Sequence, residues 1–324
     1  MNSRERFQQT MCYGRPDRVP YFEEGIRDDV LRVWRAQGMS ADRTLYQMFP
    51  IDRRHEIAPE LEPRPSPESW PDSISELTEL RQKLDPDDPG RLPSDWIEGM
   101  RAANARGDVV MFRVHRGFFQ SLGVFDWDRF EELMYLLIDD PAFVQEAMAI
   151  VGDFSVRLAK RVLKEVRVDA AIFSEPIGGN SGPLISPQMY EELVLPSYEP
   201  VLSVLRQHGV ETIIFRTYAN ARVLVPSVLK WGFNCLWACE VNLEAMDYHD
   251  LRREFGRELR LIGGIDVDVL RHDKETIRRE VEEKVPPLLA DGGYVPLADG
   301  RIRAEVPFEN YVYYRGLLEE VIHS

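Results

Sequence analysis

Short apolar runs alternate with longer stretches of helical period along most of the chain. Helical stretches with one apolar face include 141–163, the segment that starts at Pro187 after Ser186, and Lys274–Leu289. Alternation of this kind is the signature of βαβ units and a parallel sheet. We predict eight strands: Pro20–Glu23, Asp52–Ile57, Val109–His115, Asp169–Ser174, Thr212–Arg216, Asn234–Cys239, Arg260–Gly264 and Tyr294–Leu297.

Eight alternating strands and helices predict an α/β protein with a (β/α)8 TIM barrel, in which residues 1–324 form a single domain. One stretch breaks the pattern, because residues 59–96 carry eight prolines. Within it, residues 73–84 have leucines at helical spacing. We therefore expect an N-terminal proline-rich surface excursion that contains a short helix. Both a mobile lid and a static loop are compatible with this pattern.

Composition and charge exclude several classes of partner. The net charge of −15 disfavours nucleic acids and anionic membranes, which both require a basic surface. The sequence has no apolar run long enough to span a bilayer, and residues 1–10 lack the apolar core of a signal peptide. Three cysteines suit a reducing compartment better than a disulfide scaffold. We expect a cytoplasmic protein.

Polar and charged residues gather at the predicted strand ends, where the active site of a TIM barrel lies. Three of them are candidates for acid–base catalysis: Glu175, Asp52 and His115. Eight more are candidates for substrate binding: Arg216, Tyr218, Arg113, Asn180, Glu240, Asp266, Asp299 and Arg301.

The arginines in this set allow two interpretations. A guanidinium group holds carboxylates and phosphates with two parallel hydrogen bonds, so the arginines could bind a small anionic substrate. The neighbouring acids could equally pair with them in an internal salt-bridge network. Glu175 and Arg216 lie at the ends of neighbouring predicted strands, about 4.8 Å apart in a sheet. We expect them to pair directly, with Glu175 ionised and orienting Arg216. If they point apart, Glu175 becomes a general acid or base.

Segments spread over nearly the whole chain resemble the uroporphyrinogen decarboxylase superfamily, which includes corrinoid- and coenzyme M-type methyltransferases. The resemblance implies a (β/α)8 barrel and an active site at the strand ends. The segments that carry it are SRERF…YGRPDRVP (3–20), DDPAFVQEAM (139–148), VDAAIFSEPIGGNSGPLISPQMYEELVLPSYEPV (168–201), GGIDVDVL (263–270) and VPFENYVYY (306–314).

The chain departs from both familiar branches of this superfamily. The methyltransferases bind zinc through a His-x-Cys pair and a cysteine near the last strand. The corresponding positions here read Arg216-Thr217-Tyr218 and Leu297-Ala298-Asp299, so we expect no metal at this site. The decarboxylase binds the carboxylates of its substrate with paired arginines, and the matching stretch 21–35 lacks that motif and carries four acids.

Three functions are compatible with this pattern. The leading hypothesis is a zinc-independent, methyltransferase-like enzyme that acts on a small anionic or methoxylated substrate, with a corrinoid carried by a partner protein. The first alternative is a decarboxylase of a carboxylate-bearing substrate. The second is a barrel that binds a ligand without catalysis. A homodimer and a monomer both remain open.

Overall fold

The computed structural model describes residues 1–239 and 245–323, and the chain divides into two compact units. One unit comprises Met1–Arg54, Gly107–Val109 and Cys235–Ser324, and the other comprises His55–Arg106 and Val110–Asn234. We refer to them as the outer-segment unit and the middle-segment unit. Each consists of parallel strands and packed helices, so the protein is α/β, consistent with a TIM-barrel-like fold. The single-domain organisation remains a prediction.

The middle-segment unit contains the strands β1 to β4, which neighbour one another in chain order. Ala170 to Glu175 of β3 pair in parallel with Thr212 to Thr217 of β4, which places Ser174 beside Arg216. The elements are β1 (Arg54–Ile57), η1 (Ile74–Glu76), α4 (Leu77–Lys83), η2 (Pro89–Arg91), α5 (Trp96–Arg106), β2 (Val109–His115), α6 (Phe118–Ser121), α7 (Trp127–Asp139), α8 (Pro141–Glu165), β3 (Ala170–Glu175), α9 (Pro187–Met189), the π-helical turn η3 (Tyr190–Val194), α10 (Leu195–Gln207), β4 (Thr212–Tyr218), η4 (Arg222–Leu224) and α11 (Val225–Trp231).

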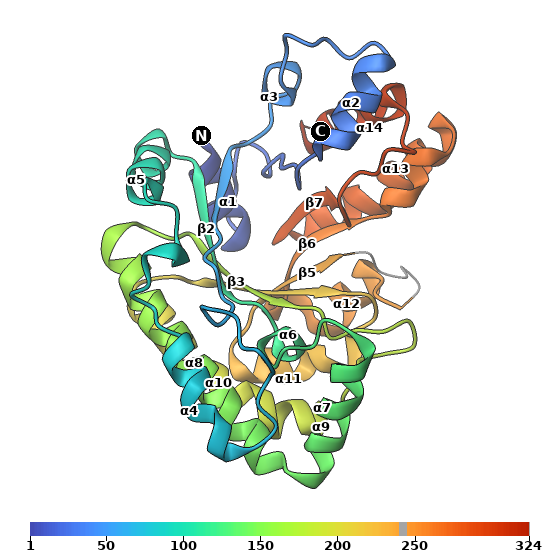
Figure 1. Cartoon of the computed structure of the whole chain (residues 1–324). Coiled ribbons are helices and arrows are strands. Elements are labelled where there is room, and N and C mark those ends of the chain that lie inside the picture. The colour runs from blue at the N-terminus through green and yellow to red at the C-terminus, as the bar shows by residue number, and fades with distance from the viewer. Residues whose placement is uncertain (240–244, 324) are drawn as a thin grey trace. The chain divides into compact units, whose positions relative to one another are not determined.

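Helix α8 begins where the sequence indicates. The side chain of Asp140 accepts a hydrogen bond from the backbone N–H of Phe143, and Pro141 occupies the first turn. Its apolar face is buried, and α8 packs against α10 and α4 (Figure 1). Ser186 caps α9 in the same way through the N–H of Met189. The short helix expected within 73–84 is present as η1 and α4.

The outer-segment unit contains the parallel strands β5, β6 and β7, with α13 packed against β6, β7 and α14 (Figure 1). No helix among residues 1–239 and 245–323 has both the length and the apolar character required to cross a membrane. The elements are α1 (Ser3–Met11), α2 (Asp28–Ala36), α3 (Leu45–Met48), β5 (Cys235–Cys239), α12 (Tyr248–Phe255), η5 (Gly256–Glu258), β6 (Arg260–Ile265), η6 (Val267–Arg271), α13 (Lys274–Asp291), β7 (Tyr294–Ala298) and α14 (Phe308–His323).

The described part of the chain has seven strands where we expected eight. Residues 20–23 form no strand. Tyr21 accepts one backbone hydrogen bond from the N–H of Asp52, at 2.9 Å. The N–H of Tyr21 instead donates to the side chain of Asp52, at 2.8 Å. A side-chain acceptor therefore takes the place of a backbone carbonyl, and the ladder does not continue.

Candidate functional site

The carboxyl-end residues of β1, β2 and β4 meet in an ion-pair cluster. Glu56 of β1 binds Arg113 of β2, with its Oε1 atom 2.8 Å from Nε and 2.6 Å from Nη2. Its Oε2 atom lies 3.7 Å from Nη1 of Arg216 on β4. The salt-bridge interpretation therefore holds at this point, with one carboxylate between two guanidinium groups. Sequence reasoning missed Glu56, although it lies in the predicted strand Asp52–Ile57.

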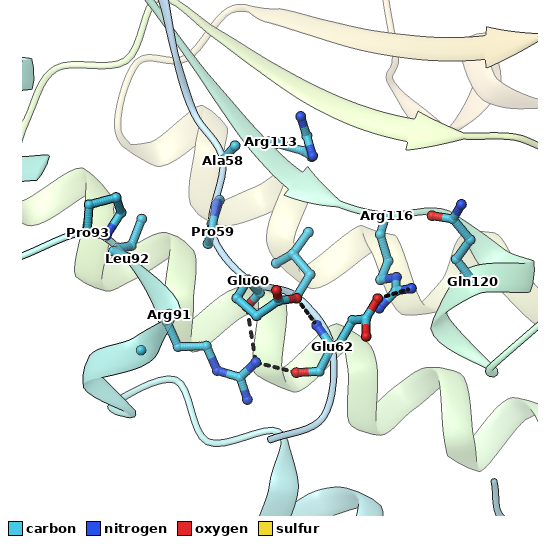
Figure 2. A pocket seen from close by; sticks show the side chains of 12 residues that line it. Ala58, Pro59, Glu60, Glu62, Arg91, Leu92, Pro93, Arg113, Arg116 and Gln120 are labelled. Carbon is cyan, nitrogen blue, oxygen red and sulfur yellow. Dashed lines mark hydrogen bonds and ion pairs between the residues drawn. The ribbon is translucent and has the colours of Figure 1, made fainter. Parts of the chain in front are cut away.

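A pocket of about 520 Å³ lies beside this cluster (Figure 2). One wall comes from the end of β2 and from α6, through Arg113, Arg116 and Gln120. The other wall consists of residues 58–62 and 90–93, so the proline-rich segment supplies much of the lining. The strand end and the proline-rich segment thus enclose a space of small-molecule size.

Arg116 is the more buried of the two arginines that line the pocket from the end of β2. Its side chain is 11% exposed, whereas that of Arg113 is 36% exposed. Its Nη2 atom lies 2.9 Å from Oε1 of Glu62, and Figure 2 shows the two side chains pointing toward each other. Its Nη1 atom is buried and has no hydrogen-bond partner among the described residues. Arg116 was not among the site residues that we selected from the sequence.

The proline-rich wall is held in place by Arg91, whose side chain is buried. Its guanidinium group donates to the carbonyl oxygens of Asp85, Lys83 and Glu60, at 2.9, 2.7 and 3.0 Å. It also donates to the carbonyl oxygen of Glu62 (Figure 2). Burial lowers the pKa of Arg91. Four backbone acceptors satisfy this cation and fix the segment that faces Arg113 and Arg116.

Glu175 is fully buried and does not pair with Arg216, so the expected pair was wrong. Its carboxylate accepts hydrogen bonds from the hydroxyls of Tyr190 and Tyr198, at 3.1 and 2.6 Å. It also accepts the backbone N–H of Phe118 at 2.7 Å. Side chains alternate along a strand, and Ser174 is the residue beside Arg216. Glu175 therefore faces η3 and α10 and fixes the start of α6.

Burial raises the pKa of Glu175 to about 7, and the hydrogen bonds from Tyr198, Phe118 and Tyr190 act in the opposite direction.

His115 lies in the same buried layer, and the centre of its ring is 4.5 Å from the centre of the Tyr198 ring. Its Nδ1 atom accepts the N–H of Gly117 at 2.9 Å, which leaves the hydrogen of the neutral ring on Nε2. Burial, assisted by the charge of Arg116, lowers the pKa of His115 to about 3.

Asp52 precedes the first residue of β1 and so lies at the amino end of that strand. Its carboxylate accepts hydrogen bonds from the Ser3 hydroxyl, the Tyr21 N–H and the guanidinium groups of Arg6 and Arg18, at 2.9, 2.8, 2.9 and 2.5 Å. All four hydrogen bonds come from residues between Ser3 and Tyr21, so this carboxylate ties the N-terminal segment to the start of β1. This placement argues against the catalytic role that we expected for Asp52.

The remaining candidates lie in loops or at strand ends. Tyr218 is the last residue of β4, and Asn180 is exposed in the loop after β3. Asp266 follows β6 and accepts the N–H of Asp268 at 2.8 Å, and Asp299 follows β7 and accepts the N–H of Val267 at 3.1 Å. Arg301 is exposed after β7. Glu240 lies outside the described residues.

The residues at the superfamily's zinc positions do not fit a zinc ion. Arg216 is a permanent cation whose guanidinium has no lone pair to offer a metal, and it lies beside Glu56. Among residues 1–239 and 245–323, no group of three or more histidine, cysteine, aspartate or glutamate side chains is placed to hold a metal ion. We derive no chemical step through zinc.

Comparison with known proteins identifies the family. The chain matches the family model of uroporphyrinogen decarboxylase (URO-D) over residues 127–311, which is more than half of the 324 residues. No curated protein matched the chain. The matched stretch contains β3 to β7 and includes Glu175, Arg216 and Asp299. The chain belongs to the uroporphyrinogen decarboxylase family.

Proposed function

We propose that this protein is an enzyme whose small anionic substrate binds to Arg113 and Arg116. The observation that carries the proposal is the position of these two guanidinium groups on the wall of the 520 Å³ pocket. Arg113 is accessible from the pocket, and Arg116 has a buried Nη1 atom that no described residue bonds. Guanidinium groups bind carboxylates with good geometry, and removal from water strengthens such contacts.

The reaction that we propose is zinc-independent methyl transfer from a methoxyl group of the substrate to a corrinoid carried by a partner protein. Loss of the methyl group leaves negative charge on the substrate oxygen, and an arginine beside it would stabilise that charge. Arg113 is suitably placed on the pocket wall, and Arg216 lies behind it across Glu56. The carboxylate of Glu60 lines the same pocket and is a candidate for proton transfer.

Decarboxylation is the second candidate, because the same arginines would hold carboxylates that remain on the product. A porphyrinogen with many carboxylates is disfavoured as its substrate. The carboxylates of Glu60 and Glu62 line the arginine pocket itself. They would repel a substrate of high negative charge.

Product analysis separates these functions. The protein is incubated under reducing conditions with methoxylated and with unmethylated small carboxylic acids, with and without cob(I)alamin as methyl acceptor. Methylated cobalamin and the demethylated acid indicate methyl transfer, whereas carbon dioxide indicates decarboxylation. Arg116→Gln should abolish either activity, and the exposed Arg253→Gln should preserve it. Binding of the acids without either product contradicts a catalytic role.

A further inference from the structure

A second hollow adjoins the arginine pocket. It has a volume of about 420 Å³ and shares Gln120 with the first pocket. Its other lining residues are mainly apolar: Val124, Phe125, Asp126, Trp127, Phe130 and Leu184. The pocket with the arginines and the hollow with the aromatic side chains therefore meet at the same residue of α6.

Arg116 and Phe125 connect the two spaces directly. The guanidinium carbon of Arg116 lies 5.0 Å from the centre of the Phe125 ring, within the range of a cation–π contact. Trp70 of the proline-rich segment lies on the same ring, with the ring centres 6.3 Å apart. Phe125 is consequently held beside the cation, at the border between the charged pocket and the apolar hollow.

Three of the five apolar side chains that line this hollow are exposed. Phe125 is 56% exposed, Trp127 is 82% exposed and Leu184 is 43% exposed. A cluster of large exposed apolar side chains next to a pocket is typical of a binding surface. The neighbouring cations identify the kind of occupant, because they require that one end of it be an anion.

The acids around the two spaces limit the charge of the occupant. Glu60 and Glu62 line the arginine pocket, and Asp126 lines the apolar hollow. Asp126 already caps α7 by accepting the N–H of Arg129, at 2.9 Å. A second anionic group on the occupant would meet these carboxylates and be repelled. One negative charge at one end of the molecule fits the arrangement best.

We propose that the substrate is an amphiphilic monoanion, with a carboxylate at Arg113 and Arg116 and a flat apolar body on Phe125, Trp127 and Leu184. This inference rests on the proposed function and names the substrate class of that site. The incoming carboxylate takes the place of Glu62 at Arg116, since the Glu62 side chain is 44% exposed and can swing into solvent. The apolar body covers side chains that are otherwise in water.

Three probes test the proposal by calorimetric titration: acetate carries only the anion, benzyl alcohol only the apolar ring, and phenylacetate both. Stacking on aromatic side chains should make phenylacetate bind at least about tenfold more tightly than acetate. Phe125→Ala and Trp127→Ala should each reduce that preference while the binding of acetate persists. Benzyl alcohol should bind more weakly than phenylacetate because it lacks the anion.

Tyr135→Ala and Ile138→Ala are the matched controls, because both residues are exposed on α7 and neither lines the hollow. They should leave the preference for phenylacetate unchanged. Equal affinities of the wild-type protein for acetate and phenylacetate would overturn the inference. The inference would also be overturned if Phe125→Ala weakened the binding of acetate and of phenylacetate to the same extent, since Phe125 would then only support Arg116. Failure of both acids to bind would instead contradict the proposed function.

Discussion

The carboxylate of Glu175 accepts the backbone N–H of Phe118 at 2.7 Å. The next N–H toward the N-terminus, that of Gly117, donates to Nδ1 of His115 at 2.9 Å. These two hydrogen bonds fix the turn that follows Arg116. Two residues that we expected to transfer protons are thus buried and hydrogen-bonded to the turn that carries the pocket arginine, and their role in proton transfer stays a prediction.

Glu175→Gln should alter how stability depends on pH. The pKa of Glu175 is about 7 in the folded protein, above its usual value of 4.5, so the folded state holds this proton more tightly than the unfolded state. As the pH rises from about 4.5 to about 7, the wild-type protein should lose of the order of 3 kcal/mol of unfolding free energy from this group. Urea unfolding at about pH 5 and about pH 8 measures the effect. Parallel pH profiles of variant and wild type would show that Glu175 is not buried as a neutral acid.

His115→Asn should have the opposite pH signature. The pKa of His115 is lowered from 6.5 to about 3, so acid favours the unfolded state, in which the ring is protonated. The wild-type protein should lose about 2 kcal/mol from this group between neutral pH and about pH 5. Asparagine can still accept the N–H of Gly117 but does not titrate, so the variant should lack this loss. His323→Asn, at an exposed position, is the control and should show the same loss of stability in acid as the wild type.

Gly117→Ala should disturb both the fold and the pocket. Gly117 has a φ of +94°, and an added Cβ would lie 2.7 Å from the Ser174 carbonyl oxygen and 2.8 Å from Oε1 of Glu175. We expect a loss of about 1–3 kcal/mol in unfolding free energy and weaker binding of small carboxylates, because Arg116 is the adjacent residue. Gly99→Ala is the control, since α5 leaves space for its Cβ, and it should be neutral or stabilising. Normal carboxylate binding by Gly117→Ala would argue that the turn does not position Arg116.

Asp52→Asn separates a structural role from a catalytic one. The substitution removes the charge that balances Arg6 and Arg18, and breaking such a pair typically costs about 3–5 kcal/mol. The affinity for small carboxylates should remain unchanged. Denaturant unfolding and a ligand titration on the same variant test both statements. A variant of normal stability that has lost all activity would restore the catalytic assignment.

The sequence predicted most strands because their apolar runs are long and bounded by turns. The run at 20–23 failed because the Asp52 side chain, which no periodicity reveals, takes the hydrogen bond of Tyr21. The Glu175–Arg216 pair failed because a shift of one residue in strand register decides which side chains face each other. Arg116 and Glu62 meet across a proline-rich segment that is held by hydrogen bonds from Arg91, and this segment has no repeating pattern to interpret.

Titration of a small carboxylate against Arg116→Gln tests the central claim most directly. Calorimetry with acetate, or with phenylacetate if acetate binds too weakly to quantify, compares the wild-type protein, Arg116→Gln and the exposed control Arg253→Gln. The account predicts that Arg116→Gln weakens binding by about 2–5 kcal/mol, because a desolvated charge pair is lost, and that the control binds like the wild type. Equal affinities of Arg116→Gln and the wild type would contradict the assignment of this pocket as the anion site.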